Sequence, residues 1–168
     1  MRVERVAALK NDVMNLLRNQ DPPAEEMVEK DAFEFSSLEQ LKGLDAMFGL
    51  QFENLVLANL QTLFPMLGLE EPLVLSAAPF FQRATTGREK CQIDLMIQTQ
   101  RMLMVVEIKR RREIGHEIID EVDAKIRKLK FGPNLSLRTA LVYDGRLSPS
   151  VAADRYFDFL IPADRFFA

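Results

Sequence analysis

Residues 91–109 read CQIDLMIQTQRMLMVVEIK and predict two β-strands joined by a short turn. Apolar and polar side chains alternate from Cys91 to Gln98, as expected for a strand with one buried face. From Met102 to Ile108 the chain is apolar on both faces, which is typical of a central strand covered on both sides. The residues between these strands, Gln98 to Arg101, would form the turn.

The segments before this hairpin are predicted to be mainly helical. Apolar residues at helical spacing predict a helix over 3–17, which must end before Pro22 and Pro23. A second helix should begin near Ser36 and run towards Phe64, with a break near Gly43 or Gly49. β-type residues over 73–81 then predict a further strand.

After the hairpin, one amphipathic helix and two short strands are expected. The helix carries an apolar stripe of Ile114, Ile118, Val122, Ile126 and Leu129. The strands are Thr139–Tyr143, before a turn at Asp144-Gly145, and Phe157–Ile161. The element order indicates an α/β fold, a mixed β-sheet flanked by helices. We expect an N-terminal helical extension over 1–46 and one main domain over 47–168.

Composition limits the location and partners of the chain. Its 168 residues contain one cysteine, Cys91, so no internal disulfide can form and a small buried hydrophobe is expected there. No apolar run is long enough to span a membrane, and a cytoplasmic location is expected. The net charge is −3, but residues 107–130 hold eight basic and six acidic side chains, against six and ten over 1–46. A polyanion should therefore meet the region 107–130.

The polar residues that interrupt apolar patterns are the candidates for chemistry. Glu107 and Lys109 continue the face of Leu103 and Val105, and a buried charge must be paired or bind a metal. The hairpin register brings Asp94 close to Glu107. Two carboxylates without a nearby His or Cys suit Mg²⁺ or Mn²⁺.

A third carboxylate, Glu53, falls in an apolar helical row with Leu57 and Phe64. Each of these groups also has an ordinary interpretation. The ordinary interpretation of Glu53 is a carboxylate at the rim of a helix, paired with a surface base. The ordinary interpretation of Glu107 and Lys109 is a salt bridge at a strand end. The only histidine, His116, lies away from the apolar stripe and is expected to face solvent.

Taken together, the residues from Gly49 to Ile161 resemble the PD-(D/E)XK, or restriction-endonuclease-like, nuclease superfamily. The resemblance rests on a helix bearing Glu53, then Asp94 on a strand, then Glu107-Ile108-Lys109 ending an apolar strand, then a helix and two strands. Ile93 stands where the proline of the family name would be. The resemblance implies a restriction-endonuclease-like sheet.

The resemblance also implies roles for individual residues. Asp94, Glu107 and the carbonyl of Ile108 would bind Mg²⁺ or Mn²⁺, Lys109 would position the attacking water, and Glu53 would support the site. Lys125, on the inward side of the following helix, resembles the lysine or glutamine that many members supply there, and it is also expected to bind DNA. The alternative for Lys125 is a solvated helix lysine. Apart from the resemblance, Arg110, Arg111 and Arg112 directly follow these residues in the sequence and would bind DNA phosphates or, as the alternative, form a solvated strand-to-helix turn.

The stretches GREKCQIDLMI and MLMVVEIKRR are also similar to the nuclease-like domain that follows an ATP-binding module in a group of prokaryotic ATPases. The chain has no Gly-x-x-x-x-Gly-Lys-Ser/Thr loop, so ATP hydrolysis is not expected of it. The sequence leaves open whether it is a fragment of a larger ATPase, binds such a partner, or forms a homodimer.

The function expected from these patterns is Mg²⁺-dependent hydrolysis of DNA phosphodiesters. The alternative is a non-catalytic DNA-anchoring or protein-interaction module that kept the same fold. An intact set of Asp94, Glu107 and Lys109 favours the enzyme.

Overall fold

The computed structural model describes residues 44–166. Residues from Gly49 onward belong to one compact unit, Gly49–Ala168. The helix expected over 3–17, the helix start near Ser36 and most of the extension over 1–46 lie outside the described residues. No helix within 44–166 is long and apolar enough to cross a membrane.

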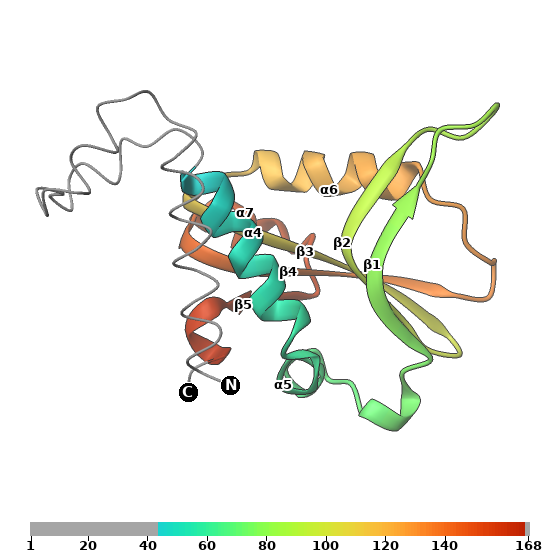
Figure 1. Ribbon diagram of the computed structural model, residues 1–168, viewed down its shortest axis with the longest axis horizontal. Coiled ribbons are helices and arrows are strands. Elements are labelled where there is room, and N and C mark those ends of the chain that lie inside the picture. Colours follow the sequence, from blue (N-terminus) through green and yellow to red (C-terminus); the bar gives the residue numbers. More distant parts are fainter. Residues whose placement is uncertain (1–43, 167–168) are drawn as a thin grey trace, which may run out of the picture. The chain divides into compact units, whose positions relative to one another are not determined.

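A five-stranded sheet in the order β1-β2-β3-β4-β5 forms the centre of the fold (Figure 1). Its strands are β1 Ser76–Gln82, β2 Cys91–Gln98, β3 Met102–Ile114, β4 Ser136–Leu147 and β5 Phe159–Pro162. The pairs β1–β2 and β2–β3 are antiparallel, whereas β3–β4 and β4–β5 are parallel. The predicted α/β class with a mixed sheet between helices is therefore confirmed, and β3 is its central strand.

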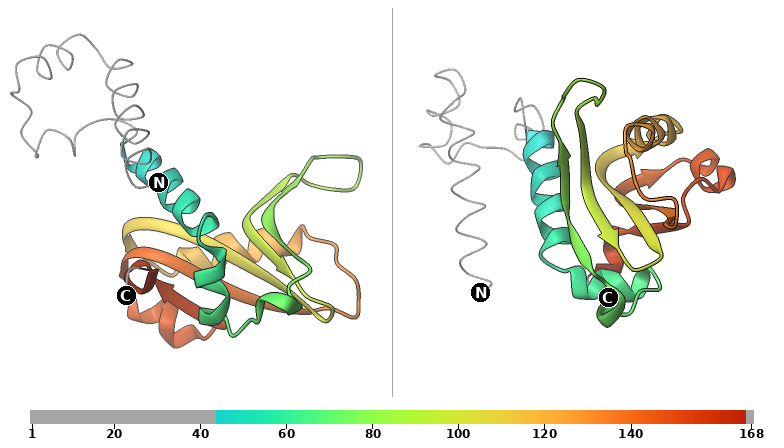
Figure 2. Two further views of the ribbon diagram at one scale, coloured as in Figure 1. Left: turned by 60° about the horizontal axis from the view of Figure 1, so that its bottom comes forward. Right: turned by 90° about the vertical axis from the view of Figure 1, so that its right-hand side faces the viewer.

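Helices cover both faces of this sheet (Figure 2). They are α4 Leu44–Leu57, α5 Leu60–Met66, α6 Glu117–Arg127 and α7 Pro149–Asp154, with short 3₁₀ turns η1 Glu71–Leu73 and η2 Ala163–Phe166. α5 and the part of α4 from residue 49 onward pack on one face, around Leu95, Val106 and Val142. α6 and α7 pack on the other face, around Val105 and Leu141.

Several predicted boundaries are wrong. β3 continues past Ile108 to Ile114, because it pairs with β4 from Met102 to Ile114, with one register shift between Arg110 and Glu113. For the same reason β4 continues through Asp144-Gly145, where a turn was expected. Ile114 is thus the last residue of β3 and does not belong to the following helix, where it was expected. The helix α7 was not predicted.

The helix α4 runs unbroken through Gly49, so of the two predicted break positions the one at Gly49 is wrong, and the one at Gly43 lies outside the described residues. The interruption comes at residues 58–59, before α5. There the Asn59 amide donates a hydrogen bond of 2.5 Å to the Leu55 carbonyl. A side chain that bonds to its own backbone in this way competes with the next helical turn.

Candidate active site

The two predicted carboxylates lie where strands β2 and β3 separate. The strands pair only from Leu95 with Val106 to Gln98 with Leu103. Asp94 and Glu107 are the next residues beyond this paired region. Figure 2 shows the β1–β2 hairpin bending away from the rest of the sheet. The separation leaves polar groups of both strands available to side chains instead of to the sheet ladder.

Next to this separation, the pairing of β1 with β2 shifts in register at Asp94 and Leu95, as in a β-bulge. Ala78 pairs with Met96 and Phe80 with Ile93, so only Pro79 of β1 lies opposite the two residues Asp94 and Leu95. Proline has no N–H to donate, so it is tolerated at edge strands and bulges. Bulges are frequent beside active sites because they re-aim a side chain.

The Asp94 carboxylate connects β2, β3 and α6. Its Oδ2 accepts a hydrogen bond of 2.9 Å from the backbone N–H of Ile108. Its Oδ1 lies 3.8 Å from the Nζ of Lys125 on α6. The same ammonium donates a bond of 2.5 Å to Oε2 of Glu107. The structure therefore brings Asp94, Glu107 and Lys125 together, and the inward orientation expected for Lys125 is confirmed.

Glu107 is the most deeply buried charged side chain among the described residues, with 2% of its surface exposed. Burial raises the pKa of Glu107, and the nearby Asp94 carboxylate raises it further. Lys125 offsets only part of this rise. Burial alone would lower the pKa of Lys125, but attraction to Glu107 and Asp94 outweighs burial and raises it. Asp94 and Glu107 together therefore favour a positive charge between them.

Lys109 lies on the same strand but pairs with a different acid. Its Nζ donates a bond of 2.7 Å to Glu121 of α6. Burial alone would raise the pKa of Glu121, but the hydrogen bond from Lys109 leaves this pKa below its usual value. Glu121 also accepts a bond of 3.1 Å from Arg111. Glu121 therefore holds the Lys109 ammonium within electrostatic range of Glu107.

Glu53 of α4 lies within electrostatic range of the site, although no hydrogen bond among the described residues joins it to Asp94 or Glu107. Burial raises the pKa of the half-buried Glu53, and the Asp94 carboxylate raises it further. The ammonium groups of Lys125 and Lys109 lower it. Its supporting role stays a prediction.

The three consecutive arginines lie within β3 and not in a turn, which corrects that expectation. Arg110 pairs with Asp144 at 3.1 Å, and Arg111 pairs with Glu117 and Glu121. Two of the three guanidinium groups are thus engaged with acids of the chain itself. Arg112 is exposed. A phosphate-binding role for these residues stays a prediction.

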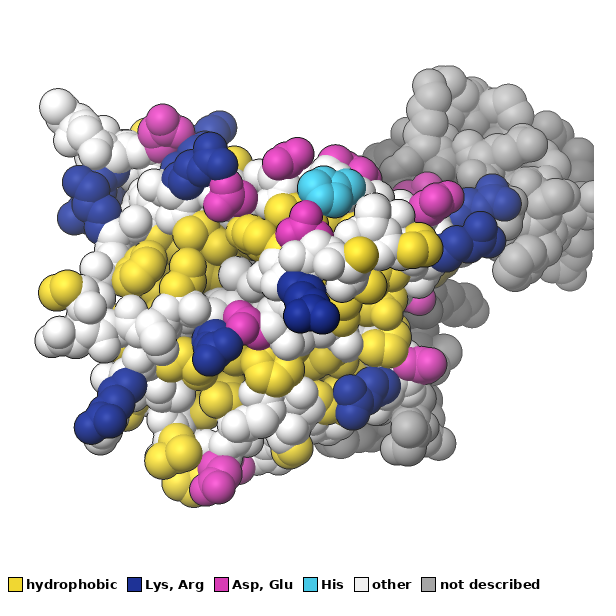
Figure 3. Space-filling model, turned by 180° about the vertical axis from the view of Figure 1, so that it is seen from behind, with side chains coloured by type: hydrophobic (Ala, Val, Ile, Leu, Met, Phe, Trp, Pro, Cys, Tyr) yellow, Lys and Arg dark blue, Asp and Glu magenta, His cyan; other side chains and the backbone are white. Residues whose placement is uncertain are grey.

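The single histidine and the single cysteine do not belong to this site. His116 is exposed at the start of α6, with its Nε2 3.0 Å from Asp154 (Figure 3). Cys91 is buried, as expected, and burial raises the pKa of its thiol. A buried thiol with a raised pKa is a poor nucleophile. Figure 3 also shows that lysines and arginines are scattered among hydrophobic and acidic side chains on this face.

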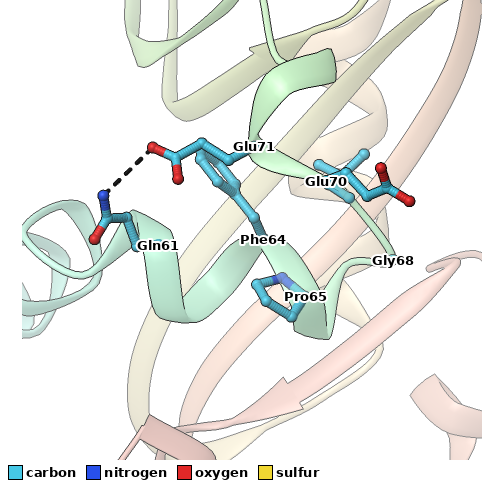
Figure 4. A pocket seen from close by; sticks show the side chains of 7 residues that line it. Gln61, Phe64, Pro65, Gly68, Glu70 and Glu71 are labelled. Atoms are coloured by element: carbon cyan, nitrogen blue, oxygen red, sulfur yellow. Dashed lines mark hydrogen bonds between the residues drawn. The ribbon is translucent and has the colours of Figure 1, made fainter.

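Two pockets differ in their relation to the site. One, of about 450 Å³, lies between α5 and η1 and is lined by Gln61, Phe64 and Glu71, with no residue of the site (Figure 4). The other, of about 770 Å³, lies between the β1–β2 hairpin and the end of α6 and is lined partly by Lys125. Only the second pocket shares a residue with the candidate site.

Sequence reasoning missed Glu121 and the direct contact of Lys125 with Asp94 and Glu107. A usable signal was present, because Glu117, Glu121 and Lys125 recur every four residues beside the apolar stripe of α6. Charges at the border of a buried stripe are placed to reach partners on the sheet. The bulge opposite Pro79 was also missed, although a proline within a strand pattern is a known indication of one.

Comparison with known protein families, curated proteins and solved structures finds no match to this chain. The functional argument therefore rests on the geometry of the site.

Proposed function

We propose that this chain is a Mg²⁺- or Mn²⁺-dependent nuclease of the PD-(D/E)XK type that hydrolyses DNA phosphodiesters. The observation that carries the proposal is the shared contact of Asp94 and Glu107 with one cation, the Lys125 ammonium. Two acidic side chains from separate strands converge on a single positive charge at a point where the sheet opens. Such convergence is the main geometric requirement of a hard-cation site.

The donor set fits a cation that keeps most of its own water. Within residues 44–166 no group of three or more His, Cys, Asp and Glu side chains is placed to enclose a metal ion. Mg²⁺ is commonly held by one or two carboxylates together with waters and substrate phosphate oxygens. Asp94 and Glu107 supply those carboxylates, and the carbonyl of Ile108 is the proposed backbone ligand. A bound cation would polarise the phosphodiester and promote ionisation of a water.

The two lysines have separate proposed roles. Lys109, held by Glu121 at 2.7 Å, would orient the attacking water or stabilise charge that develops on the phosphate. Lys125 partly offsets the negative charge of the two carboxylates, through contacts of 2.5 Å to Glu107 and 3.8 Å to Asp94. If a divalent cation bound between the two carboxylates, the Lys125 ammonium would be available to meet substrate phosphate.

One observation favours a second candidate, a non-catalytic DNA-anchoring or protein-interaction module. The Lys125 ammonium already satisfies the buried Glu107, so the fold does not need a metal for its stability. A protein that had lost catalysis would retain such an internal ion pair.

Cleavage assays separate these two candidates. Supercoiled plasmid and circular single-stranded DNA are incubated with the protein in Mg²⁺, Mn²⁺ or EDTA. We expect metal-dependent cleavage by the wild type and its loss in Asp94→Asn and Glu107→Gln. Asp120→Asn is the matched control, because Asp120 is an exposed acid on α6. Folded wild-type protein that cleaves neither DNA with any metal would support the binding module.

A further inference from the structure

The pocket between the β1–β2 hairpin and the end of α6 has an unusual lining. None of its nine lining residues is acidic. Four of them are basic: Arg83, Lys90, Lys125 and Lys128. The whole chain has a net charge of −3, so this concentration of positive charge is local. A concave basic lining favours an anionic ligand.

Arg83 and Lys90 are available to such a ligand. Both are exposed, and neither has an ion-pair partner within the described part of the chain. Lys128 pairs with Glu89 at 3.1 Å, but that carboxylate is 75% exposed. Exposed pairs of this kind are weak and are readily exchanged for a phosphate.

An exposed aromatic ring lies among these cations. Phe81 is 67% exposed, the largest value among the exposed large hydrophobic residues of the described chain. It lies on β1 directly opposite Gln92, which also lines the pocket. An exposed aromatic ring in a basic groove is the arrangement by which proteins stack unpaired bases while holding the phosphate backbone. Paired bases inside a duplex have no free face for such stacking.

The pocket shares one residue, Lys125, with the candidate active site. Lys125 lines the pocket and also contacts Glu107 at 2.5 Å and Asp94 at 3.8 Å. A strand lying along Arg83, Lys90 and Lys128 would therefore extend towards Lys125, the residue shared with the candidate site.

We infer that this pocket binds single-stranded nucleic acid, with one unpaired base stacked on Phe81 and phosphates against Arg83, Lys90 and Lys128. This inference rests on the proposed nuclease function. It means that the substrate of the nuclease site is a single strand or an unpaired end. An acidic peptide would use the same cations but has no need of the ring.

Binding measured without metal tests the inference apart from catalysis. Fluorescence anisotropy in EDTA at fixed salt compares a labelled oligothymidylate with a duplex of equal length. We expect Phe81→Ala to weaken single-strand binding about tenfold, the scale of losing one base–aromatic stack, and to leave duplex binding almost unchanged. The double variant Arg83→Ala/Lys90→Ala should weaken both and reduce the salt dependence.

Matched controls are available for both changes. Leu73→Ala removes another exposed apolar side chain, 59% exposed, which does not line the pocket, and Arg165→Ala removes an exposed base on η2. Neither should change single-strand affinity. Because Phe81 is exposed, Phe81→Ala should melt like the wild type.

The outcomes distinguish the two proposals. If the protein cleaves DNA but Phe81→Ala weakens neither ligand, or both equally, the inference is overturned and the nuclease function stands. If single-strand binding depends on Phe81 but no metal gives cleavage, the pocket assignment stands and the nuclease function fails. Polyglutamate binding as tightly as oligothymidylate, with no effect of Phe81→Ala, would overturn the inference in favour of an acidic peptide.

Discussion

Replacing Lys125 with methionine removes the cation that two carboxylates share and leaves most of the side-chain volume in place. The lost contacts are 2.5 Å to Glu107 and 3.8 Å to Asp94, and the Glu107 side chain is only 3% exposed. Removing one partner of a buried ion pair costs about 3–5 kcal/mol. Because the Lys125 side chain is 27% exposed, water offsets part of this loss, and we expect about 2–3 kcal/mol.

The measurement is the free energy of unfolding by urea in EDTA, supported by thermal melting. For a chain of this size the loss corresponds to a decrease in Tm of roughly 5–10 °C. Lys128→Met on the same helix is the matched control, because the Lys128–Glu89 pair is exposed and should be worth under about 1 kcal/mol. Adding Mg²⁺ should stabilise Lys125→Met more than the wild type, since no internal cation then competes for the two carboxylates.

A double variant decides whether the cause is unpaired negative charge. Glu107→Gln in the Lys125→Met background removes the uncompensated carboxylate and should recover at least half of the lost stability. Lys125→Met with wild-type stability in EDTA would refute the argument. So would a double variant that is no more stable than Lys125→Met.

Three further predictions follow from single contacts. Lys109→Ala should reduce single-turnover cleavage by about two to three orders of magnitude and leave DNA affinity nearly unchanged, because it removes one preorganised charge; an unchanged rate would exclude Lys109 from the chemistry. Gly145→Ala should destabilise the fold by more than about 2 kcal/mol in urea melts, since Gly145 has a φ of +129° and an added Cβ would lie 1.7 Å from the Arg111 carbonyl oxygen. Gly132→Ala, with nothing within 4 Å of the added Cβ, is its control. Finally, the raised pKa of Glu107 means that the folded state holds this proton more tightly than the unfolded state, so its contribution to stability falls as pH rises above the ordinary value of 4.5. In EDTA, Glu107→Gln should therefore gain stability relative to the wild type with increasing pH, and a constant difference across that range would contradict the pKa shift.

The sequence alone determined the order and type of the main elements. The alternation over Cys91–Gln98, the apolar run over Met102–Ile108 and the stripe of α6 are local patterns, and burial acts on each through its own backbone period. The same patterns made Glu107 and Lys109 conspicuous, because both continue a strand face that the core requires to be apolar, and the hairpin pairing placed Asp94 near Glu107. The hairpin register then followed from the short turn between the two strands.

The tertiary structure decided where strands end and which charges pair. The extension of β3 to Ile114 depends on β4, which lies more than twenty residues later and supplies hydrogen-bond partners that no local pattern contains. Likewise, Lys125 and not Lys109 neutralises Glu107, because α6 packs on the sheet so that one ammonium reaches both carboxylates while Glu121 takes the other. Periodicity predicts which face a side chain occupies, but the choice among several nearby opposite charges depends on distances of a few ångströms. Those distances are set only when elements far apart in the chain pack together.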